Sequence, residues 1–90
     1  MDPQQLIDKR NSDYGNAWKT HGLVAQLLLP QLATFLQKWP VYYFSWTMIL
    51  NKLIRALTTP ENIDHWRDIQ GYAQLVLNDL ENKSGKANRA

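Results

Sequence analysis

The apolar positions of this chain recur with the spacing of α-helices rather than of β-strands. Between positions 46 and 57, and again between 66 and 80, most of them lie three or four residues apart, which places them on one face of a helix. The members of the two stripes are Trp46, Ile49, Leu50, Leu53 and Leu57, then Trp66, Ile69, Ala73, Val76, Leu77 and Leu80. We therefore expect two helices whose apolar faces pack on a core.

The start of the chain predicts a short helix. An aspartate at the N-cap accepts a backbone hydrogen bond, and a proline fits the first helical position, so Asp2-Pro3 is a good helix start. We expect this helix to run through Arg10. Residues 11–16 have the composition of a turn.

Prolines set the next boundaries. A helix from Ala17 to about Leu29 is expected to end or kink at Pro30 and to resume over residues 31–38. Trp39-Pro40 indicates a break, because the residue before a proline avoids the α region. The aromatic residues that follow could form a strand by propensity, but no second strand is available, so we expect them to open the next helix.

Thr59 is expected to cap the last helix, with Pro60 at its first position. Gly71 lies inside that helix, and we expect another backbone to approach it closely. The predicted fold is all-α, with three to four helices and a C-terminal antiparallel helical hairpin. We expect residues 1–83 to form one domain and residues 84–90 to form a disordered basic tail.

Length and composition narrow the class of protein. Ninety residues make one small domain, and the absence of cysteine excludes disulfides and thiolate metal sites. A net charge of +2 gives little reason to expect nucleic acid. The chain opens without a signal-peptide pattern and has no apolar run of about 18 residues, so we expect a cytoplasmic protein without a membrane span.

Aromatic residues are concentrated in one short segment. Five of eight consecutive positions are aromatic, and they cannot all face one small core. We expect them to form a core together with an oligomer interface, or alternatively a surface on which bases stack or a partner protein docks. These residues are Trp39, Tyr42, Tyr43, Phe44 and Trp46.

Charged residues face each other across the predicted hairpin. Lys52 and Arg55 lie three apart before the turn, and Asp64 and Asp68 lie four apart after it, so each pair occupies one helix face. Arg55 would fall opposite Asp64, and Lys52 opposite Asp68. The group is either an ion-pair lattice, in which each pair contributes about 0–1 kcal/mol, or a phosphate site. In a phosphate site the cations would hold the phosphate, and the aspartates could hold Mg²⁺.

The two histidines do not form a catalytic pattern. His65 follows the start of the last helix, where an imidazolium would oppose the helix dipole, so we expect it to be exposed. His21 has no partner at a metal-ligand spacing, which favours a structural role. The four glycines match neither the P-loop nor the glycine-rich fingerprint of dinucleotide-binding proteins.

Residues 10–80 resemble a small helical domain of phages and prophages that is similar to the MazG-type nucleoside triphosphate pyrophosphohydrolases. The resemblance is carried by Asp13-Tyr14-Gly15, His21, the Met48, Lys52 and Arg55 spacing, and above all by the stretch from Asp64 to Ala73. It implies an oligomeric helical core. In that family, carboxylates on two neighbouring helices hold Mg²⁺, and water attacks between the α and β phosphates.

The chain departs from that family where the chemistry would lie. Between Trp46 and Leu57 there is no acidic residue, and Lys52 and Arg55 occupy the positions expected for acidic ligands. We therefore expect a nucleotide-binding protein that has lost catalysis, with Tyr14, His21 and Tyr72 orienting the ligand. The alternatives are a phage-type protein that binds a host protein, and an active Mg²⁺-dependent enzyme with ligands from a second subunit.

Overall fold

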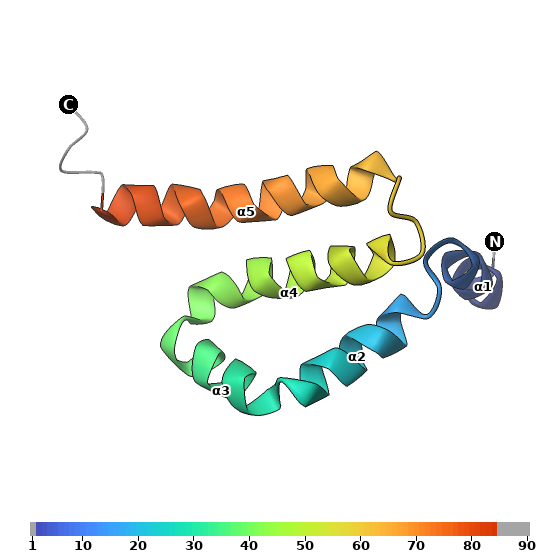
Figure 1. Ribbon diagram of the computed structural model, residues 1–90, viewed down its shortest axis with the longest axis horizontal. Coiled ribbons are helices and arrows are strands. Elements are labelled where there is room, and N and C mark those ends of the chain that lie inside the picture. Colours follow the sequence, from blue (N-terminus) through green and yellow to red (C-terminus); the bar gives the residue numbers. More distant parts are fainter. Residues whose placement is uncertain (1, 85–90) are drawn as a thin grey trace.

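The computed structural model describes residues 2–84, apart from the side chains of residues 11–14 and 84 (Figure 1). This part of the chain contains five α-helices and no strand, which confirms the all-α class but exceeds the expected three to four helices. The helices are α1 (Pro3–Tyr14), α2 (Ala17–Leu27), α3 (Leu29–Lys38), α4 (Pro40–Ala56) and α5 (Ile63–Ser84).

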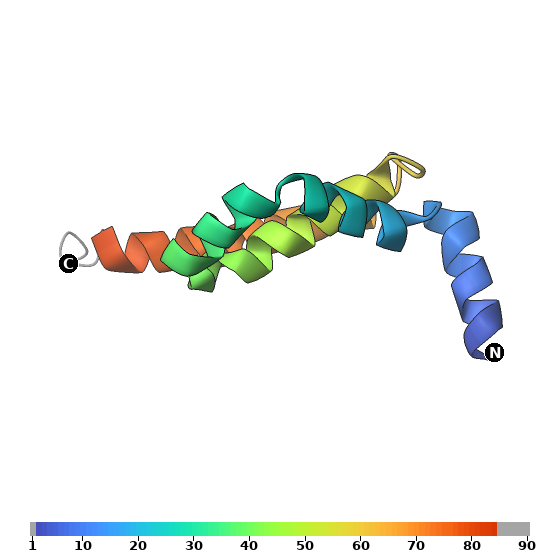
Figure 2. The same ribbon diagram turned by 90° about the horizontal axis from the view of Figure 1, so that it is seen from below.

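Helix α4 occupies the middle of a single layer. Helix α5 lies along one side of α4 and runs in the opposite direction, while α2 and α3 lie along the other side (Figure 1). Seen edge-on in Figure 2, these helices form a thin layer, and α1 projects from one end of it. The molecule measures 52 × 31 × 24 Å.

Helix α1 starts as expected but ends later. The Asp2 carboxylate accepts a hydrogen bond from the Gln5 backbone at 2.8 Å, and the Gln5 side chain accepts one from the Asp2 backbone at 3.0 Å. The helix then continues to Tyr14, so the prediction of a turn over residues 11–16 was wrong for its first four residues. It stops at Gly15, whose φ of +64° is open to glycine at little cost.

The breaks at the two inner prolines follow the predictions. Leu28 separates α2 from α3, and Pro30 occupies the first turn of α3, where its missing N–H is not needed. Trp39 leaves the helical conformation, with a φ of −133° and a ψ of 53°, and Pro40 opens α4. The aromatic residues after Pro40 are therefore helical, as expected.

Helix α5 begins three residues later than expected. Thr59 does not cap it and Pro60 is not its first residue, because the helix starts at Ile63 and the Asn62 side chain accepts the hydrogen bond of the Asp64 N–H at 3.0 Å. The Pro60 carbonyl instead accepts the hydrogen bond of the Trp66 indole N–H at 2.8 Å. That contact holds the preceding residues in a turn.

The core is small. Its buried apolar residues are Ala17, Leu32, Ile54 and Ala56. Leu53 and Leu57, which we expected in the core, are exposed, because Ile54 and Ala56 carry the buried face of α4 at its C-terminal end. The expectation for Gly71 was also wrong, since a Cβ placed there would meet nothing within 4 Å. Among the described residues, none of the helices is both long and apolar enough to span a bilayer.

Candidate functional site

The charged hairpin, which consists of Lys52, Arg55, Asp64 and Asp68, contains an ion pair between its two helices. Lys52 Nζ lies 2.9 Å from Asp68 Oδ2, which is the expected pairing, and the Lys52 side chain is only 14% exposed. An ammonium in that position is already neutralised by a carboxylate. The Lys52–Asp68 pair therefore joins α4 to α5, as the lattice interpretation requires, and leaves Lys52 poorly suited to hold phosphate.

His65 is buried, with only 2% of its surface exposed, so the expectation of an exposed histidine was wrong. Its Nε2 atom lies 2.8 Å from the Thr59 hydroxyl, which places the ring between α5 and the preceding turn. Burial lowers the pKa of His65 below 6.5, and the positive charges of Lys52 and Arg55 lower it further, against the opposing effect of Asp68 and Asp64. The imidazole is therefore a neutral structural group.

Arg55 lines a cavity of about 360 Å³ at the end of the layer where α1, α2 and α4 meet. Arg10 of α1 lines the same cavity, so two guanidinium groups from helices far apart in the sequence share it. The other lining residues are Ile7, Gly15, Ala17, Trp18 and Asn51. Their chemistry combines apolar walls, an indole, an amide and two cations.

Local structure brings these residues together. Ile7 and Arg10 are three apart on α1, so they share one face of that helix. Gly15 turns the chain from α1 into α2, and its backbone lies close to Thr58 after α4, since a Cβ on Gly15 would come within 2.9 Å of the Thr58 hydroxyl. This tight junction positions α1 beside the C-terminal half of α4, where Arg55 lies.

Trp18 is the aromatic wall of the cavity. Trp18 is largely exposed, and the Lys19 ammonium lies 5.4 Å from the centroid of its ring. An indole of this kind can stack against a planar group such as a nucleobase. Lys19 adds a third positive charge near the cavity.

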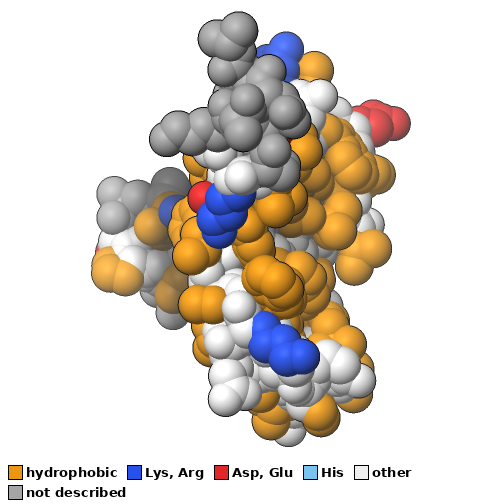
Figure 3. Space-filling view, turned by 90° about the vertical axis from the view of Figure 1, so that its left-hand side faces the viewer, with side chains coloured by type: hydrophobic (Ala, Val, Ile, Leu, Met, Phe, Trp, Pro, Cys, Tyr) orange, Lys and Arg blue, Asp and Glu red, His pale blue; other side chains and the backbone are white. Residues whose placement is uncertain are grey.

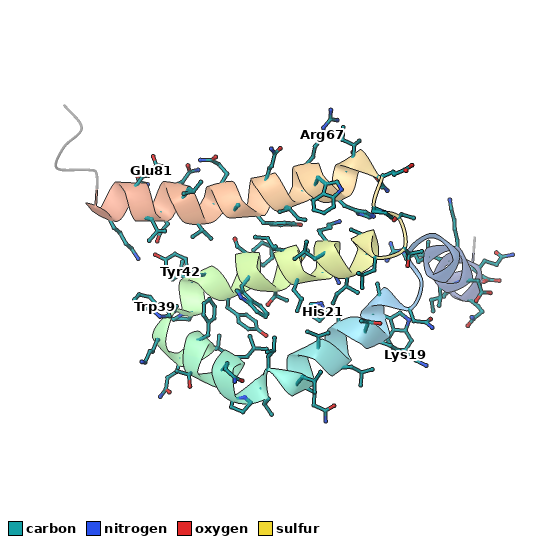
Figure 4. All side chains as sticks on the ribbon, viewed as in Figure 1. Lys19, His21, Trp39, Tyr42, Arg67 and Glu81 are labelled. Carbon is teal, nitrogen blue, oxygen red and sulfur yellow. The ribbon has the colours of Figure 1, made fainter. Side chains whose placement is uncertain are left out.

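Of the three residues expected to orient a ligand, Tyr72 and His21 do not line this cavity. The side chain of Tyr14 lies outside the described part of the chain. The Tyr72 ring packs edge-on against Phe44, with centroids 5.7 Å apart, which places it between α5 and α4. His21 points from α2 towards α4 (Figure 4), and its buried Nδ1 has no hydrogen-bond partner among the described residues.

The aromatic segment is divided between the two sides of α4. The Trp46 ring lies 6.2 Å from Phe35 of α3, and Phe44 contacts α5 through Tyr72. The Tyr42 hydroxyl donates a hydrogen bond of 2.8 Å to Asp79 Oδ2, and Asp79 also pairs with Lys83 at 3.1 Å. These residues therefore hold the layer together.

Part of the same segment stays open. Trp39, whose ring lies 6.1 Å from that of Tyr42, and Phe44 remain exposed, whereas Tyr43 is half-buried. Figure 3 shows hydrophobic side chains spread over this end of the molecule, with few charges among them.

The two aspartates expected to bind Mg²⁺ do not form a metal centre with other acidic groups. Asp64 is exposed and Asp68 is paired with Lys52. Among the side chains that the structure describes, no group of three or more histidine or acidic residues is arranged to hold a metal ion. A divalent ion at Asp68 would have to compete with the Lys52 ammonium at 2.9 Å.

Sequence reasoning did not find three of the cavity residues: Arg10, Trp18 and Asn51. In the sequence, Arg10 is one of several cations near the ends of the chain, and Trp18 suits a helix like the other apolar residues around it. Asn51 lies four residues before Arg55 on α4, a spacing that could have grouped these two residues. No spacing links Arg10 or Trp18 to Arg55, because they belong to α1 and α2 and meet α4 only through the junction at Gly15.

Comparison with known proteins gives a family for the chain. No curated protein and no solved structure matches it. Residues 2–79 match the model of a family described as a domain of unknown function, DUF6378. That range includes α1 to α4 and most of α5, and with them every residue that lines the cavity. The chain therefore belongs to the DUF6378 family.

Proposed function

We propose that this protein binds a phosphorylated small molecule, most simply a nucleotide, in the cavity between α1, α2 and α4. The observation that carries the proposal is that Arg10 and Arg55, from different helices, line one cavity together with Trp18. A guanidinium group donates two parallel hydrogen bonds to phosphate oxygens, which makes arginine the usual residue for such ligands.

The size and lining of the cavity agree with a ligand of this kind. A volume of about 360 Å³ falls within the range of small-molecule pockets, roughly 300–1,000 Å³. Trp18 offers a stacking surface for a base, and the Asn51 amide offers both a donor and an acceptor for its edge. The phosphates would lie towards the two arginines. The proposal thus keeps Arg55 as a phosphate ligand and replaces Lys52 with Arg10.

The proposed activity is binding without hydrolysis. Pyrophosphate hydrolysis of the MazG type needs carboxylates that hold Mg²⁺, and the charged hairpin offers Asp68 only as the partner of Lys52. A relative of those enzymes that has lost catalysis, acting in the cytoplasm of a cell or of a phage host, is the interpretation that we favour. An active enzyme would need further carboxylates from a second subunit.

A second candidate function is protein binding. It is favoured by the exposure of Trp39 and Phe44, which are 54% and 57% exposed although both are large apolar residues. Exposed apolar patches on small proteins commonly mark interaction sites. In this case the nucleotide cavity would be unused, and the partner would be a host protein.

The first proposal is tested by calorimetric titration with nucleoside mono-, di- and triphosphates and with inorganic triphosphate. We expect saturable binding to the wild-type protein. Arg10→Ala and Arg55→Ala should each weaken it about tenfold or more, because a hydrogen bond to a charged group contributes roughly 1.5–3 kcal/mol. Arg55→Lys should fall between them and the wild type, since lysine keeps the charge but loses the two-point contact.

Arg67→Ala is the matched control, because Arg67 is exposed and points away from α4 (Figure 4). It should bind with wild-type affinity. Circular dichroism of each variant separates loss of binding from loss of fold. If no phosphorylated compound binds the wild-type protein, or if Arg67→Ala weakens binding as much as Arg55→Ala, the cavity is not the site.

A further inference from the structure

One chain on its own exposes more surface than a compact protein of its size. Its accessible surface is 6909 Å², whereas a folded monomer of 10.5 kDa is expected to expose about 5400 Å². Its radius of gyration is 16.3 Å, against about 12 Å for a compact domain of this length. The excess surface is on the order of 1500 Å².

The interior of one chain is correspondingly thin. Among the described residues, no large side chain is completely buried, and two of the four buried apolar residues, Ala17 and Ala56, are alanines. Burial of apolar surface is the main favourable term in folding, so a single layer with so little core is marginal. We therefore expect a partner to bury part of the exposed apolar surface of the layer whenever the chain folds.

Helix α5 shows where such a partner would lie. Its side towards α4 carries Tyr72, whose ring meets Phe44. Successive residues of a helix are about 100° apart around its axis. By this geometry a second stripe of apolar residues lies roughly a third of a turn around the helix from the side that carries Tyr72. We call this stripe the α5 seam, and it consists of Ile63, Trp66, Ala73, Leu77 and Leu80.

The α5 seam has the spacing of a helix–helix contact. Its residues recur at alternating intervals of three and four, with Gln70 at the one polar position of the stripe. A stripe repeating every 3.5 residues is the pattern that packs against another helix. Its four large members are all between 44% and 57% exposed, so the described part of the chain leaves about half of each side chain open.

We propose that the α5 seam is the contact surface between two copies of this chain, packed seam to seam. A second copy is the one partner that is always present at equal concentration, as the thin core requires. The excess surface of about 1500 Å² belongs to the whole chain, and the projecting α1 contributes to it. It is of the same order as the roughly 1,000–2,500 Å² that each subunit buries in an obligate homodimer. The seam and the cavity involve different helices, so this inference does not depend on the proposed ligand.

The oligomeric state measured by light scattering after size exclusion tests the proposal. The wild-type protein should have twice the 10.5 kDa mass of one chain. Leu77→Glu places a charge in the α5 seam and should shift the protein to the monomer mass, or raise the dissociation constant at least a hundredfold. Leu75→Glu is the matched control, because Leu75 is 54% exposed on the same helix but lies outside the seam.

Two further variants keep the test decisive if Leu77→Glu fails to fold. Leu80→Ala is a milder change at the same surface and should weaken the dimer while circular dichroism stays helical. The chain has no cysteine, so Ala73→Cys introduces a unique thiol with which dimers can be trapped by a bifunctional crosslinker. A monomeric wild-type protein would overturn the proposal, and so would a Leu75→Glu variant that dissociates as readily as Leu77→Glu.

Discussion

Lys52 and Arg55 show how two similar residues on one helix acquire different roles. They lie three apart on α4, and from the sequence both are candidates for phosphate. The structure pairs Lys52 with Asp68 across to α5, whereas Arg55 lines the cavity beside α1. The sequence could predict that cations and carboxylates meet across the hairpin. It could not predict which cation also reaches a cavity, because that depends on where α1 lies.

His65 gives a prediction about stability and pH. Its pKa in the folded protein lies below the ordinary 6.5, chiefly because it is buried, so between these two values the unfolded chain binds a proton that the folded chain does not. The stabilisation is therefore complete above about pH 6.5 and is lost as the pH falls towards the lowered pKa. Urea unfolding from pH 7.5 to 5 should show this loss.

His65→Gln is the control for that experiment. Glutamine can still hydrogen-bond to the Thr59 hydroxyl, which lies 2.8 Å from the His65 ring, but it does not gain a proton in this range. Every other group is common to both proteins, so the difference between their pH profiles isolates His65. Parallel profiles would show that the buried imidazole does not contribute.

At the scale of elements, prolines predicted the helix boundaries better than turn-forming residues did. Pro3, Pro30 and Pro40 each stand in the first turn of a helix, because a missing N–H costs nothing there. Pro60 misled the prediction, since its carbonyl accepts the Trp66 indole hydrogen bond and it lies in a turn before α5. The polar run at the end of α1 also misled it, because a weak turn preference did not overcome continuation of the helix up to Gly15.

The glycines give a prediction about these elements. Gly71→Ala should stabilise the protein by about 0.5–1 kcal/mol, because glycine is a poor helix former and the added methyl meets open space. Gly15→Ala should destabilise it, because the residue has a φ of +64° and the methyl would come within 2.9 Å of the Thr58 hydroxyl. Denaturant unfolding of the two variants should move the midpoint in opposite directions. A shift of both midpoints in the same direction would contradict this account of the two sites.

At the scale of the whole molecule, the sequence predicted helices but not their layer. Periodicity indicated the stripe of α5, yet Trp66, Leu77 and Leu80 of that stripe are exposed in one chain. A hydrophobic stripe predicts that one helix face will be buried. It does not show whether that face is buried by the same chain or by another one. The cavity was beyond prediction for a similar reason, because three helices form it and α1 projects from the layer (Figure 2).

The layer leads to a prediction about heat stability. If two copies fold together through the α5 seam, the melting temperature depends on protein concentration by mass action. A hundredfold dilution of the wild-type protein should lower it by several degrees, because two decades of concentration correspond to roughly 2.7 kcal/mol of association free energy. The melting temperature of Leu77→Glu should not change on dilution. A wild-type melting temperature that is equally constant would exclude folding coupled to assembly.

The central position of α4 affects how inherited or engineered variation in this family can be interpreted. This helix touches α5 through Lys52, touches α3 through Trp46 and lends Arg55 to the cavity. A substitution along α4 would therefore affect both folding and the proposed ligand binding. A genetic screen alone could not separate these two effects. Arg10 stands on the helix that projects from the layer, so a substitution there should affect the proposed ligand binding with little disturbance of the other helices.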